Sequence, residues 1–280
     1  DPKLRHIHKA TVRDRVVHQA VFRILYHFFD KKFIHDSYSC RFSKGTHKGV
    51  LRLERFARKA SANYRKPAYI LKCDIKKFFY NVDHKILFGL ISKTIQDPDT
   101  LLLLEKIIRS FESDPRKGLP LGNVTSQLFA NVYLNELDQF VKRELETRYY
   151  IRYCDDFVIV SDDALKLRTL IPCIGDFLLK RLCLSLHPRK VSIRKLEQGV
   201  DFLGYVTFPR FRVLRTSTKQ RMFQRCASVF AISADRAREG YAARVLSSYK
   251  GLLSHSREYR SWKRLEKLYE NGGSCEKLQS

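Results

Sequence analysis

The sequence predicts an α+β protein with a small, mostly antiparallel sheet flanked by helices. Segments with helical spacing of apolar residues alternate with short, almost wholly apolar runs. Hydrophobic residues make up 44% of the 280 positions, and 19 Phe and 14 Tyr can fill a large core. No uncharged apolar stretch approaches the roughly 20 residues that cross a bilayer. A globular protein is expected, and a disordered polycation and an integral membrane protein are excluded.

Helices are expected where apolar residues recur every three or four positions. In chain order, the expected helices of the first two thirds span 14–29, 50–60, 97–111, 125–145 and 164–182. The segment 37–49 has two glycines and three serines and is expected to be a loop. A second break is expected at Gly118-Leu-Pro-Leu-Gly122.

Strands are expected in the short apolar runs. The run 69–75 carries Asp74 near its end, and 149–160 predicts a hairpin with Cys154-Asp155-Asp156 at its tip. A second hairpin is expected to pair 191–193 with 200–208 around the turn at 197–199. The basic C-terminal segment is expected to be helical around 243–253 and 262–269.

The distribution of charge indicates a polyanionic partner. Of the net charge of +25, residues 1–66 contribute +12, residues 67–205 contribute +3 and residues 206–280 contribute +10. A nearly balanced centre between two cationic flanks is typical of a nucleic-acid-binding protein that keeps its acids for a separate purpose. A solvated basic surface, or binding to polyphosphate or anionic lipid, would give the same pattern.

The seven cysteines are scattered without a C-x-x-C pair. They predict neither disulfides nor a zinc site, and favour a reducing, intracellular compartment.

Asp155-Asp156 is the strongest candidate for chemistry. Two adjacent carboxylates between apolar runs repel each other and lose hydration, so they need a compensating cation. Mg²⁺ prefers such oxygen ligands, and Asp74 could supply a third if its strand lies beside the hairpin. The pair Asp162-Asp163, which lies just before a helical pattern, is explained by helix capping alone.

The motifs around these acids resemble those of reverse transcriptases. Tyr153-Cys-Asp-Asp156 resembles the Tyr-x-Asp-Asp box, and Asp74-Ile-Lys-Lys-Phe-Phe79 resembles the first catalytic box. Further blocks follow the family order over nearly the whole chain. They comprise Arg13, Arg41 with Lys44, the segment Leu184 to Lys190, and a primer grip at Phe202, Leu203, Gly204 and Tyr205.

The resemblance implies a right-hand polymerase with fingers at 1–66, a palm at 67–205 and a helical thumb at 206–280, with further fingers elements within 85–117. It implies that two Mg²⁺ ions, or Mn²⁺ as a substitute, are bound by a set of four residues. This set is Asp74, Ile75, Asp155 and Asp156. The three aspartates would be catalytic.

The resemblance also implies the nucleotide contacts. Phe79 would be the steric gate against the sugar, although Phe78 or a plain core role also fits the pattern. Arg41 and Lys44 would clamp the triphosphate. Lys190 could protonate the departing pyrophosphate, and a solvent-facing lysine is an equal alternative.

One block departs from the common pattern of Gln-Gly-x-x-x-Ser-Pro. This sequence has Leu121-Gly-Asn-Val-Thr-Ser-Gln127, which keeps Gly122 but replaces the glutamine and the proline. The variant resembles reverse transcriptases of diversity-generating retroelements, which copy a template RNA with errors at adenines. An apolar side chain beside the nascent base pair lowers discrimination that depends on polar contacts; neutral drift is the alternative explanation.

The resemblance implies a cytoplasmic enzyme of bacterial or phage origin. Its expected partners are template RNA, a primer, the cDNA, deoxynucleoside triphosphates and a small basic accessory protein, with no membrane. A group II intron or retron-type enzyme is the alternative, against which Leu121 and Gln127 count. A non-catalytic RNA-binding protein on the same scaffold is a further alternative, against which the three intact aspartates count.

Overall fold

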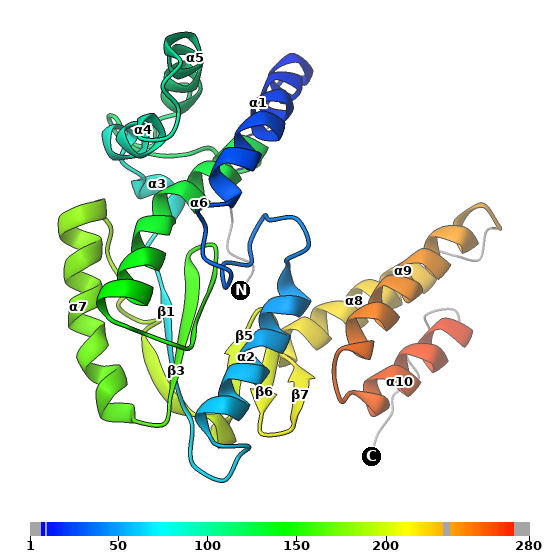
Figure 1. Ribbon diagram of the computed structural model, residues 1–280. Coiled ribbons are helices and arrows are strands. Elements are labelled where there is room, and N and C mark those ends of the chain that lie inside the picture. Colours follow the sequence, from blue (N-terminus) through cyan, green and yellow to red (C-terminus); the bar gives the residue numbers. More distant parts are fainter. Residues whose placement is uncertain (1–6, 9, 232–235, 272–280) are drawn as a thin grey trace. The chain divides into compact units, whose positions relative to one another are not determined.

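The computed structural model describes residues 7–8, 10–231 and 236–271 (Figure 1). The chain divides into two compact units, Asp1–Arg194 and Lys195–Ser280. Helices combined with a four-stranded and a three-stranded sheet confirm the expected α+β class. The boundaries of fingers, palm and thumb stay predictions.

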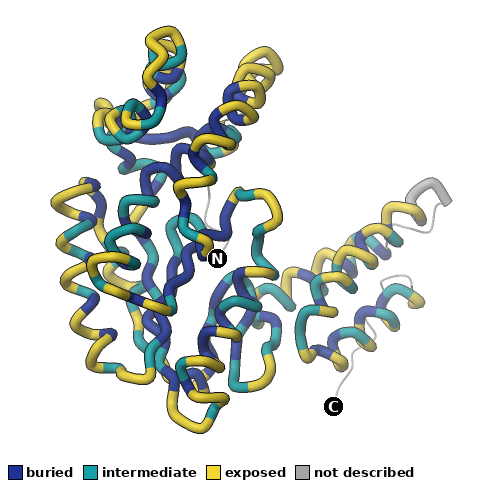
Figure 2. The backbone as a smooth tube through the Cα atoms, viewed as in Figure 1, coloured by how far each residue is buried: buried dark blue, intermediate teal, exposed yellow. Residues whose placement is uncertain are grey.

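The first unit is built on a four-stranded sheet with the order β2-β3-β1-β4. Its strands are β1 Tyr69–Asp74, β2 Tyr150–Tyr153, β3 Asp156–Ser161 and β4 Ser192–Lys195. The central strand β3 pairs antiparallel with both β1 and β2. The middle of β3 and half of β1 are buried, including Leu71, Cys73, Phe157 and Val158. Much of the sheet is accordingly drawn dark blue in Figure 2. The sheet therefore forms the centre of the core of this unit.

In the described residues of the first unit, seven α-helices surround this sheet or extend from it. They are α1 Val12–Asp30, α2 Thr46–Ala60, α3 Phe78–Asn81, α4 His84–Ser92, α5 Pro98–Arg109, α6 Val124–Gln139 and α7 Ala164–Leu182. Helix α2 packs against β2 and β3, α7 packs against β1 and β3, and α1 packs against α6. Asp163 accepts a hydrogen bond from the amide of Leu165, which confirms the predicted capping of α7.

Three local predictions for this unit need correction. The expected loop 37–49 is shorter than predicted, because α2 begins at Thr46. Gly45 precedes the helix with a φ of 118°, a conformation that favours glycine. Helices α3 and α4 were not expected as separate elements, although Asp83 caps α4 by accepting from the amide of Ile86. The expected helix 125–145 ends as a π-helical turn, Phe140–Glu144.

The second unit holds the other sheet and the last three α-helices. Its elements are the 3-10 turn Leu196–Gln198, β5 Val200–Phe202, β6 Tyr205–Phe208, β7 Phe211–Leu214, α8 Thr216–Ala231, α9 Arg236–Ser254 and α10 Tyr259–Glu270. The three strands pair in sequence as a meander. In the described residues no helix is long and apolar enough to cross a membrane.

The expected hairpin between 191–193 and 200–208 is wrong. Strand β4 instead joins the first sheet beside β1, whereas β5 pairs with β6. The 3-10 turn and Gly199, with a φ of 78°, redirect the chain between the two sheets. A Cβ atom at Gly199 would lie 2.6 Å from the ring of Phe208, so this turn requires glycine.

Candidate active site

The two candidate acids Asp74 and Asp156 lie directly opposite each other at the ends of β1 and β3. The register of these antiparallel strands pairs the two residues, so their side chains project from the same face of the sheet. Asp155 lies in the turn between β2 and β3, after Cys154, whose φ of 56° is unusual for a residue with a side chain. The amide of Ile75 donates to the carbonyl oxygen of Asp155 over 3.1 Å, which ties this turn to the end of β1. The fold therefore pairs Asp74 with Asp156 and places Asp155 in the adjoining turn.

Asp156 is an electrostatically costly residue. Its Oδ1 atom is buried without a hydrogen-bond partner, and its Oδ2 atom lies 3.4 Å from Nζ of Lys72. Burial raises the pKa of Asp156 to about 6; Lys72 opposes this rise, and the charges of Asp74 and Asp155 add to it. Sequence reasoning missed Lys72. The signal was available, because a residue two positions before Asp74 on a strand projects from the same face.

Lys190 reaches the same carboxylate cluster from a loop far along the chain. Its Nζ atom lies 2.5 Å from Oδ2 of Asp74. The loop is held there by main-chain hydrogen bonds, since the amide of His187 donates to the carbonyl oxygen of Asp74 over 2.7 Å and the amide of Lys76 donates to Ser185 over 2.9 Å. The predicted block from Leu184 to Lys190 is thus next to Asp74.

The donor set fits a hard divalent cation. Three carboxylates, one with an unpartnered buried oxygen, gather more negative charge than Lys72 and Lys190 balance. Within the described ranges, however, no three Asp, Glu, His or Cys side chains are grouped closely enough to hold a metal ion by themselves. Mg²⁺ commonly takes only one or two protein carboxylates and completes its shell with water and substrate phosphates, so such a preformed cage is not required.

Arg41 and Lys44 are engaged with the protein itself. Arg41 donates to Oδ1 of Asp30 over 2.6 Å and to the carbonyl oxygens of Ile34 and Ser37 over 2.6 and 3.1 Å. Nζ of Lys44 donates to the carbonyl oxygen of His35 over 2.8 Å. The two side chains therefore brace the loop before α2, and a triphosphate would have to replace some of these contacts.

The two phenylalanines after the first acidic box differ in burial. Phe78 is fully buried and its ring lies 6.3 Å from that of Tyr133, whereas Phe79 is only partly buried. The carbonyl oxygen of Phe79 accepts from the amide of Leu119 over 2.7 Å, which fixes the start of α3. Of these two rings only that of Phe79 is partly accessible, and its role as a steric gate stays a prediction.

The block 121–127, which differs from the common pattern of the family, lies at the start of α6. Gly122 has a φ of 120°, and a Cβ atom there would lie 3.2 Å from the carbonyl oxygen of His8, so this position favours glycine. Leu121 is partly buried and Gln127 is exposed on the first turns of α6. The structure keeps these three residues on one short segment.

His18 of α1 anchors this block, and sequence reasoning did not single it out. Its Nε2 atom lies 3.3 Å from the side-chain amide nitrogen of Asn123, and its Nδ1 atom lies 2.8 Å from Oγ1 of Thr125. Because the amide nitrogen can only donate, Nε2 accepts and the Nδ1–H group donates to Thr125. The neutral ring satisfies both contacts.

This neutral ring predicts a loss of stability in mild acid. Burial lowers the pKa of His18, and the charge of Asp14 opposes that shift. The folded protein therefore disfavours the imidazolium, and the stabilisation is present above the ordinary value of 6.5 and lost as the pH falls through the lowered pKa. Thermal unfolding between pH 7 and pH 5 should show a smaller loss for His18→Gln than for the wild type. His27→Gln, an exposed change on the same helix, should keep the wild-type slope; equal slopes for all three proteins would contradict the prediction.

The predicted primer grip is a tight hairpin in the second unit. Leu203 and Gly204 both have positive φ values, 53° and 87°, as a type I′ turn requires. The flanking Phe202 and Tyr205 are buried, and the hydroxyl of Tyr205 donates to the carbonyl oxygen of Leu252 over 3.1 Å. The hairpin is thus attached to α9 within its own unit.

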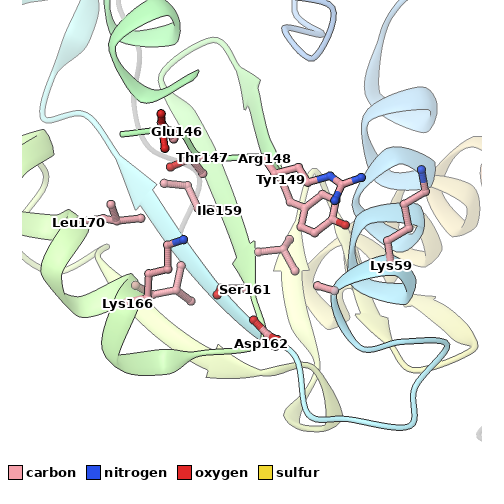
Figure 3. Close-up of a pocket in the computed structure, with 13 residues that line it drawn as sticks. Lys59, Glu146, Thr147, Arg148, Tyr149, Ile159, Ser161, Asp162, Lys166 and Leu170 are labelled. Carbon is pink, nitrogen blue, oxygen red and sulfur yellow. The ribbon is translucent and has the colours of Figure 1, made fainter. Parts of the chain in front are cut away.

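A cavity of about 260 Å³ lies at the other end of the first sheet (Figure 3). Tyr149 and Ser161 line it, and Ser161 pairs with Tyr69 at the end of β3 that is opposite Asp156. Lys59, Arg148 and Lys166 are among the other lining residues. This cavity is separate from the aspartate cluster.

Comparison with known proteins gives the family. The reverse transcriptase (RNA-dependent DNA polymerase) family matches residues 1–207. Protein YkfC of Escherichia coli (strain K12) is 23% identical over 274 residues, which cover 82% of this chain and 71% of that protein. The group II intron-encoded protein LtrA of Lactococcus lactis subsp. cremoris is 29% identical over 145 residues, which cover 50% of this chain and 23% of LtrA.

Solved telomerase structures share the fold. Telomerase from Candida tropicalis has a TM-score of 0.56 at 10% identity, over 92% of this chain and 54% of that chain. Telomerase from Candida albicans in complex with the TWJ fragment of telomeric RNA has a TM-score of 0.54 at 11% identity, over 90% and 47%. This chain thus spans about half of each telomerase and about a quarter of LtrA. The likeness confirms the expected polymerase fold.

The matched family is the class of RNA-directed DNA polymerases. The chain belongs to the reverse transcriptase family, whose match covers well over half of its length.

Proposed function

We propose that this chain extends a primer on an RNA template with deoxynucleoside triphosphates. The observation that carries this proposal is the placement of Asp74 opposite Asp156, with Asp155 in the adjoining turn, inside the region matched by the family. In the reaction, the 3′ oxygen of the primer attacks the α-phosphorus and pyrophosphate leaves. The residues of this site hold, orient and neutralise the reacting groups.

Two Mg²⁺ ions would be held by the carboxylates of Asp74, Asp155 and Asp156 and by the main-chain carbonyl oxygen of Ile75. They would activate the 3′-hydroxyl and stabilise the leaving oxygen. The side chains add charge and shape. Lys190, whose Nζ atom lies 2.5 Å from Oδ2 of Asp74, would donate a proton to the departing pyrophosphate. Phe79 excludes a 2′-hydroxyl by volume.

Within this class we infer the diversity-generating type, which makes errors at template adenines and works with a small basic accessory protein. Leu121 and Gln127 support this subclass, because both replace residues of the common block. The likeness to LtrA supports the second candidate, a group II intron-type enzyme. The two candidates differ in the errors that they would leave in cDNA.

Sequencing cDNA made on a defined RNA separates these candidates. The diversity-generating type predicts substitutions concentrated at template adenines, and Leu121→Gln with Gln127→Pro should lower them by about tenfold, because polar discrimination is restored. Position 127 lies near the start of α6, where a proline removes few helix hydrogen bonds. Leu179→Gln, at an exposed leucine of α7, is the matched control and should keep the wild-type spectrum. A flat error spectrum in the wild type would overturn the subclass and leave the polymerase activity intact.

A further inference from the structure

A fully buried arginine lies directly behind the turn that carries the candidate acids. Arg152 is on β2, two residues before Cys154, and its side chain has no exposed surface. Its Nε and Nη2 atoms donate to the two carboxylate oxygens of Asp138 on α6 over 2.8 and 2.7 Å. Its Nη1 atom donates to the carbonyl oxygen of Cys154 over 3.2 Å. One guanidinium thus joins α6 to the main chain of the turn.

The same arginine also holds the loop before α2. Its Nη2 atom donates to Oγ of Ser37 over 3.2 Å, and its carbonyl oxygen accepts from the amide of Tyr38 over 2.9 Å. Asn131 of α6 completes this connection: its side-chain oxygen accepts from Nη1 of Arg152 over 3.1 Å, and its nitrogen donates to the carbonyl oxygen of Ser39 over 2.9 Å. The loop continues directly to Arg41 and Lys44.

The charge of this arginine is retained in spite of its burial. Removal from water disfavours the guanidinium, but the adjacent Asp138 more than offsets this, so the pKa of Arg152 is raised. A planar guanidinium can bind several fixed acceptors at once, which a lysine ammonium on a flexible stem cannot do. A general need for a buried charge would be met by the pair with Asp138 alone. The added contacts to Cys154, Asn131 and Ser37 point to a more specific role.

We propose that Arg152 is a positioning residue, which fixes the turn bearing Asp155 and Asp156 relative to the loop that carries Arg41 and Lys44. This inference rests on the proposed polymerase function. It assigns to Arg152 no contact with substrate. Its effect is transmitted through the carbonyl oxygen of Cys154 and the hydrogen bonds to Ser37 and Asn131.

The test is Arg152→Lys, which keeps the positive charge beside Asp138 but loses the planar guanidinium that donates to several acceptors at once. We expect kcat for primer extension to fall about 10- to 100-fold, the size of effect that a displacement of about 1 Å has on reacting groups. The Mg²⁺ concentration for half-maximal extension should rise several-fold. The rise in unfolding temperature on adding Mg²⁺ should shrink, which is a readout independent of activity. The control is Ile174→Ala, which leaves a cavity at a buried position of α7 and so destabilises the protein away from the turn. It should keep the wild-type kcat and Mg²⁺ response.

A second variant keeps the test decisive if Arg152→Lys does not fold. Asn131→Ala removes one contact to Arg152 and the contact to Ser39, and should shift kcat and the Mg²⁺ response in the same direction by a smaller factor. A folded Arg152→Lys protein with wild-type kcat and Mg²⁺ response would overturn the positioning role. Equal losses in Ile174→Ala would do the same, because the effect would then be one of stability. A wild type that neither extends primers nor responds to Mg²⁺ would instead refute the proposed function.

Discussion

Asp156→Asn is expected to abolish primer extension and, at the same time, to stabilise the metal-free protein at neutral pH. The amide has the shape of the carboxylate without its charge. It removes the repulsion with Asp74 and Asp155 and the cost of a buried charge that lifts the pKa of Asp156 from 3.8 to about 6. A shift of this size corresponds to a gain on the order of 1–3 kcal/mol. Because the folded pKa is raised, the gain is full above pH 6 and disappears as the pH falls below 3.8.

The test is to measure the unfolding temperatures of the wild type and of Asp156→Asn at pH 7.5 and pH 4, with and without Mg²⁺. Mg²⁺ should raise the unfolding temperature of the wild type and have little effect on Asp156→Asn, since a ligand stabilises only the state that binds it. Asp162→Asn makes the same change in an exposed pair and should alter neither activity nor the Mg²⁺ response. An Asp155→Ala, Asp156→Ala protein should still bind RNA. Primer extension at the wild-type rate by Asp156→Asn would refute the catalytic assignment.

Local signals in the sequence were sufficient for much of the fold. Asp97-Pro98 and Asp163 mark helix starts because capping and the fixed φ of proline act over only a few residues. The repulsion between Asp155 and Asp156 is likewise visible from their adjacency. The meeting of Asp74 with Asp156 was expected only on the condition that the strand of Asp74 lies beside the hairpin, and the pairing of β1 with β3 meets that condition.

Contacts between distant segments could not be predicted in the same way. The place of β4 beside β1 depends on how the chain passes a 3-10 turn, and apolar alternation says nothing about which edge a short strand joins. Arg152 looked like one more cation, because its acceptor Asp138 is on a helix whose acidic residues resemble solvent-facing ones in sequence. The internal contacts of Arg41 were hidden for the same reason.

The buried pair of Arg152 and Asp138 predicts a large loss of stability when its acid is removed. Asp138 is completely buried and accepts hydrogen bonds from Arg152 and from the hydroxyl of Tyr150 at 2.8 Å. Asp138→Ala removes the counter-charge of the buried guanidinium and the acceptor of both its Nε atom and the Tyr150 hydroxyl, while the contacts to Cys154, Asn131 and Ser37 remain. Removing one partner of a buried ion pair typically costs about 3–5 kcal/mol. Against the total of about 5–15 kcal/mol for a protein domain, this loss is severe. Urea unfolding at 25 °C should show it as a lower midpoint.

Burial, more than the presence of an ion pair, sets the size of this effect. Asp30→Ala breaks a pair with Arg41 of the same chemistry, but the Asp30 side chain is 32% exposed and Arg41 keeps its carbonyl acceptors, so a loss of about 1 kcal/mol is expected. The double variant Arg152→Met with Asp138→Leu removes both charges together and should recover most of the stability lost in Asp138→Ala. Such a protein would still lack the guanidinium that holds the turn of Asp155 and Asp156. Recovered stability without recovered primer extension would therefore separate the contribution of Arg152 to stability from its positioning of the turn. Equal losses for Asp30→Ala and Asp138→Ala would contradict the role of burial.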